Sequence, residues 1–127
     1  MSSPEAAAKA AICQYLDLQG NHLLYWVQQS QGIWSKARGV YLKKPGYFKN
    51  GMPDIGVQLT IRGLPIFVGL EVKAGRNKQD PDQVEFQKLM EQGRGFYFVV
   101  HNIHETKLAL EAVEREVLSR LGHAPIF

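Results

Sequence analysis

The chain has 127 residues, 45% of them hydrophobic, which is typical of a single compact domain covering residues 1–127. Its one cysteine, Cys13, excludes an intramolecular disulfide and a multi-cysteine zinc site, and this favours a reducing, cytoplasmic location. Fifteen basic and twelve acidic residues leave a net charge of only +3, which does not by itself indicate a nucleic-acid partner. The N-terminal stretch has no basic n-region and no long apolar run, so we expect neither a signal peptide nor a membrane anchor.

A first helix is predicted from Pro4 to about Gln19, because Ser3 is a favoured N-cap and proline a favoured first-turn residue. Its apolar stripe comprises Ala8, Ile12 and Leu16. Glu5 lies three residues before Ala8 and therefore on the buried face of the helix. An acid in the first turn complements the helix dipole, which is sufficient reason for Glu5 by itself.

A strand over residues 22–29 follows and is expected to pair with the later hairpin. Residues 30–53 contain no acid, and their four glycines predict a loop. Five basic residues are interleaved with aromatic ones there: Lys36, Arg38, Lys43, Lys44 and Lys49. Basic side chains neutralise phosphates and aromatic rings stack on bases, so the segment is either a nucleic-acid contact or a solvated loop whose aromatic residues pack on the core.

Residues 51–73 alternate between apolar and other residues on both sides of Gly63, which predicts a β-hairpin. With the turn centred on Gly63 and Leu64, Asp54 faces Lys73 and Gly56 faces Glu71. Asp54, Glu71 and Lys73 then share one face of the sheet, and a register shift of two residues preserves that face. Gly56 and Gly69 are expected to leave room above Glu71.

Two carboxylates held close together on a half-buried sheet repel each other unless a cation lies between them. Oxygen ligands of this kind suit Mg²⁺ or Mn²⁺, and Lys73 on the same face could contact a phosphate or an attacking water. The alternative is an exposed, salt-bridged sheet face without chemistry. Spacing does not distinguish the two interpretations.

The remaining elements are a basic turn containing Arg76 and Lys78, a helix starting near Asp80, a strand over residues 95–101 and a last helix ending at Gly122. Gln83 stands at the third position of the first of these helices, where it forms a capping box with Asp80. Its amide could also point toward the catalytic face. The predicted buried stripes comprise Phe86, Leu89 and Met90 in one helix and Leu110, Val113, Val117 and Leu121 in the other.

Met52-Pro53-Asp54 followed by Glu71-Val72-Lys73 resembles the PD-(D/E)xK signature of a nuclease superfamily. The downstream Asp80-Pro81-Asp82-Gln83, Gly93 and the strand from Phe96 resemble the VRR-NUC family within it, over the chain from the first helix to about Asn102. The last strand reads Val99-Val100-His101-Asn102 where that family has a Val-Arg-Arg run.

The resemblance implies an α/β fold of the restriction-endonuclease type, with a central mixed sheet of about four strands flanked by helices. It implies that Asp54, Glu71, the Val72 carbonyl and Glu5 bind Mg²⁺ or Mn²⁺. Lys73 and Gln83 would act with that ion in hydrolysing phosphodiester bonds. The basic residues of the loop, with Arg76 and Lys78, would contact DNA.

The expected function is a structure-specific DNA endonuclease similar to Holliday-junction resolvases, acting as a homodimer on branched DNA. Two alternatives remain: a nuclease of the same superfamily that acts on flaps, duplex ends or specific sequences, and a nucleic-acid-binding module that does not cut.

Overall fold

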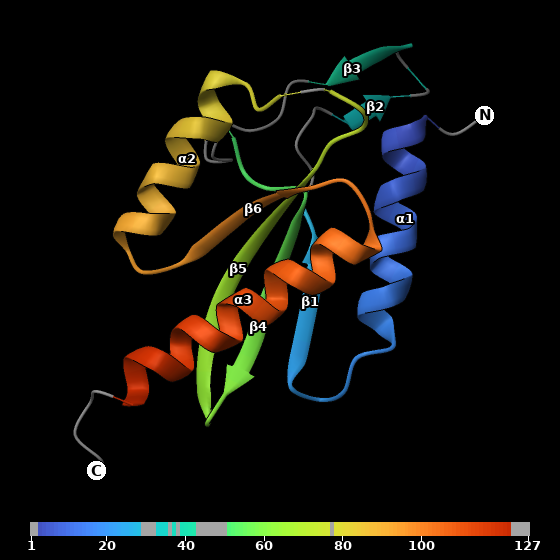
Figure 1. The fold of residues 1–127 in the computed structure, drawn as a ribbon. Helices are drawn as coiled ribbons and strands as arrows, with labels where there is room; N and C mark the ends of the chain where they lie inside the picture. The colour runs from blue at the N-terminus through green and yellow to red at the C-terminus, as the bar shows by residue number, and fades with distance from the viewer. Residues whose placement is uncertain are drawn as a thin grey trace.

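A four-stranded mixed sheet is the centre of the computed structural model, which describes residues 3–28, 33–35, 37, 39–42, 51–76 and 78–122 (Figure 1). The strand order is β1-β4-β5-β6, and only β5 and β6 run parallel. The strands are β1 (Leu23–Val27), β4 (Ile55–Ile61), β5 (Leu64–Val72) and β6 (Phe96–Val100), and the helices are α1 (Pro4–Asp17), α2 (Pro81–Gln92) and α3 (Ile103–Gly122). This architecture confirms the predicted α/β fold.

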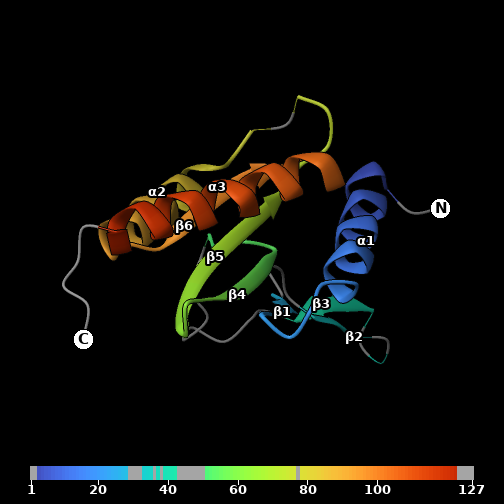
Figure 2. The same ribbon diagram turned by 60° about the horizontal axis from the view of Figure 1, so that its bottom comes forward.

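The alternating pattern of the strands decides which helices cover which face. The apolar positions of β4 and β5 meet the stripes of α1 and α3, and this core comprises Ile12, Leu16, Ile55, Val57, Val68, Leu70, Val113 and Val117 among others. Figures 1 and 2 show α1 and α3 on that face. On the opposite face α2 contributes Phe86, whose ring centroid is 6.4 Å from that of Tyr97, and Met90, which lies beside Gly69. Leu89 was predicted to be buried with them but is 47% exposed.

The hairpin register differs by two residues from the one predicted. Ile61 pairs with Leu64, so the turn is Arg62-Gly63, with φ of 51° and 79°. Two consecutive residues with positive φ define a type I′ turn, whose twist matches that of the strands, and glycine is favoured at its second position. A turn centred on Gly63 and Leu64 would have required a positive φ at leucine. The predicted pairings of Gly56 with Glu71 and of Asp54 with Lys73 are therefore wrong, and Gly56 pairs with Gly69.

The helix ends follow local hydrogen bonding. The Ser3 hydroxyl accepts from the Ala6 N–H and caps α1, which ends at Asp17 and not Gln19, because Leu18 and Gln19 donate to carbonyls three residues earlier. The Asp80–Gln83 capping box of α2 is present in both directions. At α3, Asn102 accepts from the Glu105 N–H.

The segment predicted to be a loop contains a second, two-stranded sheet formed by β2 (Ile33–Ser35) and β3 (Val40–Leu42). Short strands flanked by glycines and charges give a weak sequence pattern, which explains the wrong prediction. Figure 1 shows this ribbon at the end of the molecule where α1 and α2 begin. In the described part of the chain, no helix combines the length and apolarity needed to cross a membrane.

Candidate active site

Asp54 and Glu71 lie opposite one another at the end of the β4–β5 ladder. Ile55 pairs with Leu70, so the next positions outward are Asp54 and Glu71, and the two-residue shift keeps both on the predicted face. Asp54 is 4% and Glu71 2% exposed. The Val72 N–H donates to Asp54 Oδ2 at 2.9 Å, which fixes the aspartate to the strand that carries Glu71.

Each carboxylate is paired with a lysine. Lys73 Nζ lies 3.6 Å from Glu71 Oε1, and Lys9 Nζ, from α1, lies 3.3 Å from Asp54 Oδ1. The alternative interpretation, an exposed and salt-bridged sheet face, is therefore only partly right. The salt bridges are present, but the carboxylates that form them are buried. Taking carboxylates out of water is unfavourable, and the two ammonium groups offset part of that loss.

Glu71 has the most perturbed acidity in the cluster. Burial above all, then the charge of Asp54 and a hydrogen bond with it, raise the pKa of Glu71 from 4.5 to about 8, and Lys73 and Gln83 oppose this shift. The protonated form of Glu71 thus relieves the repulsion between the two acids. A bound cation would do the same and would favour the charged form.

Gln83 is oriented by the capping box. Its Oε1 accepts from the Asp80 N–H at 2.9 Å, which leaves its amide NH₂ for Glu71, whose charged form it favours. The capping role and a position at the site therefore coexist, as the sequence allowed. Gly51 holds this helix end close: its φ is 79°, and a Cβ there would lie 2.1 Å from the Asp82 carbonyl oxygen. A residue larger than glycine would push the first turn of α2 away.

Two residues of the cluster were not predicted. Tyr97 is 5% exposed and its hydroxyl lies 3.5 Å from Glu71 Oε2, a long contact for a hydrogen bond. Burial, followed by the charge of Glu71, raises the pKa of Tyr97, so its hydroxyl stays a donor. The other residue is Lys9, which stands four residues after Glu5 and so shares its helix face, a signal that the sequence did contain.

The glycines of the hairpin do not leave open space above Glu71 as predicted. Gly56 lies under Trp26, and a Cβ there would come within 2.4 Å of the indole ring. Gly69 lies under Pro53, whose Cγ would be 2.7 Å from an added Cβ. Because these two glycines have no side chain, Trp26 of β1 and Pro53 pack directly on the hairpin backbone. The packing of Pro53 fixes the backbone that carries Asp54.

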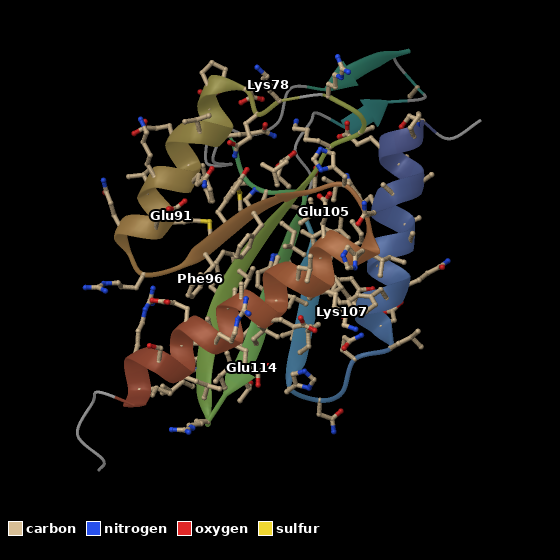
Figure 3. The ribbon with its side chains drawn as sticks, viewed as in Figure 1. Lys78, Glu91, Phe96, Glu105, Lys107 and Glu114 are labelled. Atoms are coloured by element: carbon tan, nitrogen blue, oxygen red, sulfur yellow. The ribbon has the colours of Figure 1, made fainter. Side chains whose placement is uncertain are left out.

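Of the remaining predicted site residues, Glu5, Arg76 and Lys78 lie in the described part of the chain. Glu5 lines a cavity of about 450 Å³ with Ser3, Pro4, Ala6, Lys9 and Ala74, next to the end of β5. Arg76 and Lys78 are exposed in the turn before α2, and Figure 3 labels Lys78 near the start of that helix. The basic residues of the long segment lie outside the described residues: Lys36, Arg38, Lys43, Lys44 and Lys49.

The described residues do not bring three His, Cys, Asp or Glu side chains together at a distance that could hold a metal ion. Glu5 is thus not placed with Asp54 and Glu71, and its role as a ligand stays a prediction, as does that of the Val72 carbonyl. The donor set nevertheless suits a hard divalent cation, because two adjacent carboxylates supply oxygen atoms and Mg²⁺ or Mn²⁺ completes its shell with water and substrate oxygens.

The interpretation of these residues as a candidate metal site rests on their geometry alone. Comparison with family models, with curated proteins and with solved structures found no match.

Proposed function

We propose that the chain is a Mg²⁺- or Mn²⁺-dependent nuclease that hydrolyses phosphodiester bonds in DNA. The observation that carries this proposal is the pair of buried carboxylates, Asp54 and Glu71, opposite one another at a sheet end with Lys73 beside them. Strongly perturbed acidity that arises from burial and a specific neighbouring charge is typical of functional sites.

Asp54 and Glu71 would hold the cation, which would supply Lewis acidity at the phosphate and lower the pKa of a water molecule. Lys73 would hold and orient the attacking water and donate to phosphate oxygens, where negative charge develops. Gln83 would help to position the same groups through its NH₂, since the capping box already fixes its side chain. Tyr97, whose hydroxyl lies 3.5 Å from Glu71 Oε2, would help to orient that carboxyl.

The preferred substrate is a branched DNA, cut by a homodimer. A single-site domain hydrolyses one strand per binding event, whereas resolution of a four-way junction needs two cuts related by two-fold symmetry, which a symmetric dimer supplies. Basic residues flanking the site, including Arg76 and Lys78, support a polyanionic substrate. Light scattering at micromolar concentration, with mapping of the cuts on a four-way junction, tests this finer proposal. A monomer that nicks flaps or linear duplexes would favour the alternative nuclease substrates.

The test of the proposed chemistry is cleavage of linear, flapped and four-way DNAs with and without Mg²⁺ or Mn²⁺. Wild-type protein should cut only with a divalent ion, and Asp54→Asn and Glu71→Gln should each abolish cutting while remaining folded. Asp82→Asn, at an exposed position on α2, is the matched control and should retain activity. Activity near the wild-type level in Glu71→Gln would refute the site assignment. DNA binding without cutting by the wild type under every condition would favour a binding module.

A further inference from the structure

Lys9 occupies a distinctive place in the cluster, because it comes from α1 and not from the hairpin that carries the other charges. Asp54 Oδ2 accepts from the Val72 N–H, and Lys9 Nζ lies 3.3 Å from the other oxygen, Oδ1. The lysine therefore contacts the carboxylate oxygen that the backbone does not bind. A divalent ion that binds Asp54 by this oxygen has to share it with an ammonium group or replace it.

The two lysines of the cluster are not equally held. The side chain of Lys73 is 14% exposed, whereas that of Lys9 is 30% exposed. Lys9 also lines the cavity of about 450 Å³ at the start of α1, and Glu5, one helical turn earlier, lines the same cavity. A flexible four-carbon stem allows the ammonium to move, and an acid four residues before a lysine is a favourable helical partner. Glu5 thus stands at the helical spacing of an alternative partner for Lys9, away from Asp54.

We propose that Lys9 is the resident cation of Asp54 in the metal-free protein, and that a divalent ion binding to the carboxylates displaces it toward Glu5 and the cavity. This inference rests on the proposed function, because it assumes that Asp54 and Glu71 bind a metal ion. Two cations on one carboxylate oxygen repel each other, so the ion and the Lys9 ammonium compete. In this scheme Glu5 receives the displaced lysine and is not a ligand.

The test is a Mn²⁺ titration by isothermal calorimetry of the full chain, without DNA. Lys9→Met removes the competing charge but retains the length of the stem, so Mn²⁺ should bind about fivefold tighter than to wild type, the scale of a partly exposed ion pair. Lys9→Arg retains a cation and should remain near wild type. Lys107→Met, at an exposed position on α3 (Figure 3), is the control and should change nothing.

A double-mutant cycle separates the two roles of Glu5. If Glu5 receives the displaced lysine, Glu5→Gln weakens Mn²⁺ binding in the wild type but has no effect in Lys9→Met. If Glu5 is a metal ligand, Glu5→Gln weakens Mn²⁺ binding both in the wild type and in Lys9→Met. The assignment of Glu5 as the partner of the displaced lysine is then wrong.

Three results have distinct meanings. Tighter binding by Lys9→Met supports the displacement. Equal or weaker binding by Lys9→Met, with clear binding by wild type, overturns the displacement and leaves the proposed nuclease intact. Absence of Mn²⁺ binding in wild type and in Lys9→Met, both folded by circular dichroism, overturns the metal site itself and the inference with it. Lys9→Gln replaces Lys9→Met in these comparisons if the methionine variant does not fold.

Discussion

Replacing Glu71 with glutamine should stabilise the metal-free protein, and increasingly so as the pH rises. Glutamine resembles the protonated form of glutamate in shape and has no charge to bury. The carboxyl at this position is buried opposite Asp54, so its charged form is disfavoured in the folded state. Mutation of a buried polar residue usually lowers the free energy of unfolding, but at this site we expect it to rise.

The magnitude follows from the pKa of Glu71, which is about 8 in the folded state against an ordinary value of 4.5. A raised pKa means that the folded state binds the proton more tightly than the unfolded state does. The stability contributed by Glu71 is therefore fully present below pH 4.5 and is lost as the pH rises through 8. Each pH unit in this window corresponds to about 1.4 kcal/mol, so the loss reaches roughly 3 to 5 kcal/mol in total. Glu71→Gln lacks this loss.

Urea unfolding followed by tryptophan fluorescence, in EDTA at pH 5 to 9, measures the difference. The free energy of unfolding of Glu71→Gln should match that of wild type near pH 5 and exceed it by a few kcal/mol at pH 9. Glu85→Gln, at an exposed position on α2, is the control and should follow wild type throughout. Mn²⁺ should then stabilise the wild type and not Glu71→Gln. Parallel stability curves for wild type and Glu71→Gln across this pH range would refute the burial argument.

Three further predictions address other residues. Lys73→Met should lower turnover by orders of magnitude without weakening the Mn²⁺ affinity measured by calorimetry, since lysine is not a ligand; a collapse of that affinity would contradict its role. Gly51→Ala should lower the free energy of unfolding by several kcal/mol more than Gly63→Ala, because both glycines have a φ of 79° but only Gly51 lies against backbone, that of Asp82. Equal losses of stability would show that the first turn of α2 moves away at little cost. Alanine replacement of Lys36, Arg38, Lys43, Lys44 and Lys49 should weaken DNA binding for all sequences and reduce its salt slope by about 0.9 per lost phosphate contact, and unchanged binding in a filter assay would make the segment structural.

The placement of Asp54 and Glu71 could be predicted from the sequence because it depends only on the alternation of side chains along two strands. Alternation gives the face of a residue even when the register is wrong by two, as it was here. The register itself depended on the turn type, and Gly63 with a preceding arginine gives a weaker signal than Asn-Gly would. The capping box at Asp80 and Gln83 was predictable because it is local.

Neighbours from distant parts of the chain could not be predicted in the same way. Tyr97 reaches Glu71 through the register of the parallel β5–β6 pair, which no turn connects directly. Trp26 covers Gly56 through the pairing of β1 with β4, so the space expected above the hairpin is filled by a residue about thirty positions earlier. Leu89 is likewise 47% exposed although helical periodicity places it with Phe86 and Met90, because periodicity does not report which distant residues cover a helix face.

The contrast between the two faces of β4 and β5 supports a functional reason for the charged cluster. On the face that meets α1 and α3, both strands present aliphatic side chains that are nearly or fully buried. On the other face their adjoining ends bury Asp54 and Glu71, which then need Lys9 and Lys73 as partners. Buried ion pairs are commonly no more stabilising than well-packed apolar residues of similar volume, so the fold does not require charges here. A buried Glu71 whose charged form is disfavoured fits the proposed cation site, and the Glu71→Gln and Lys9→Met variants test the burial of that charge and the displacement of Lys9 separately.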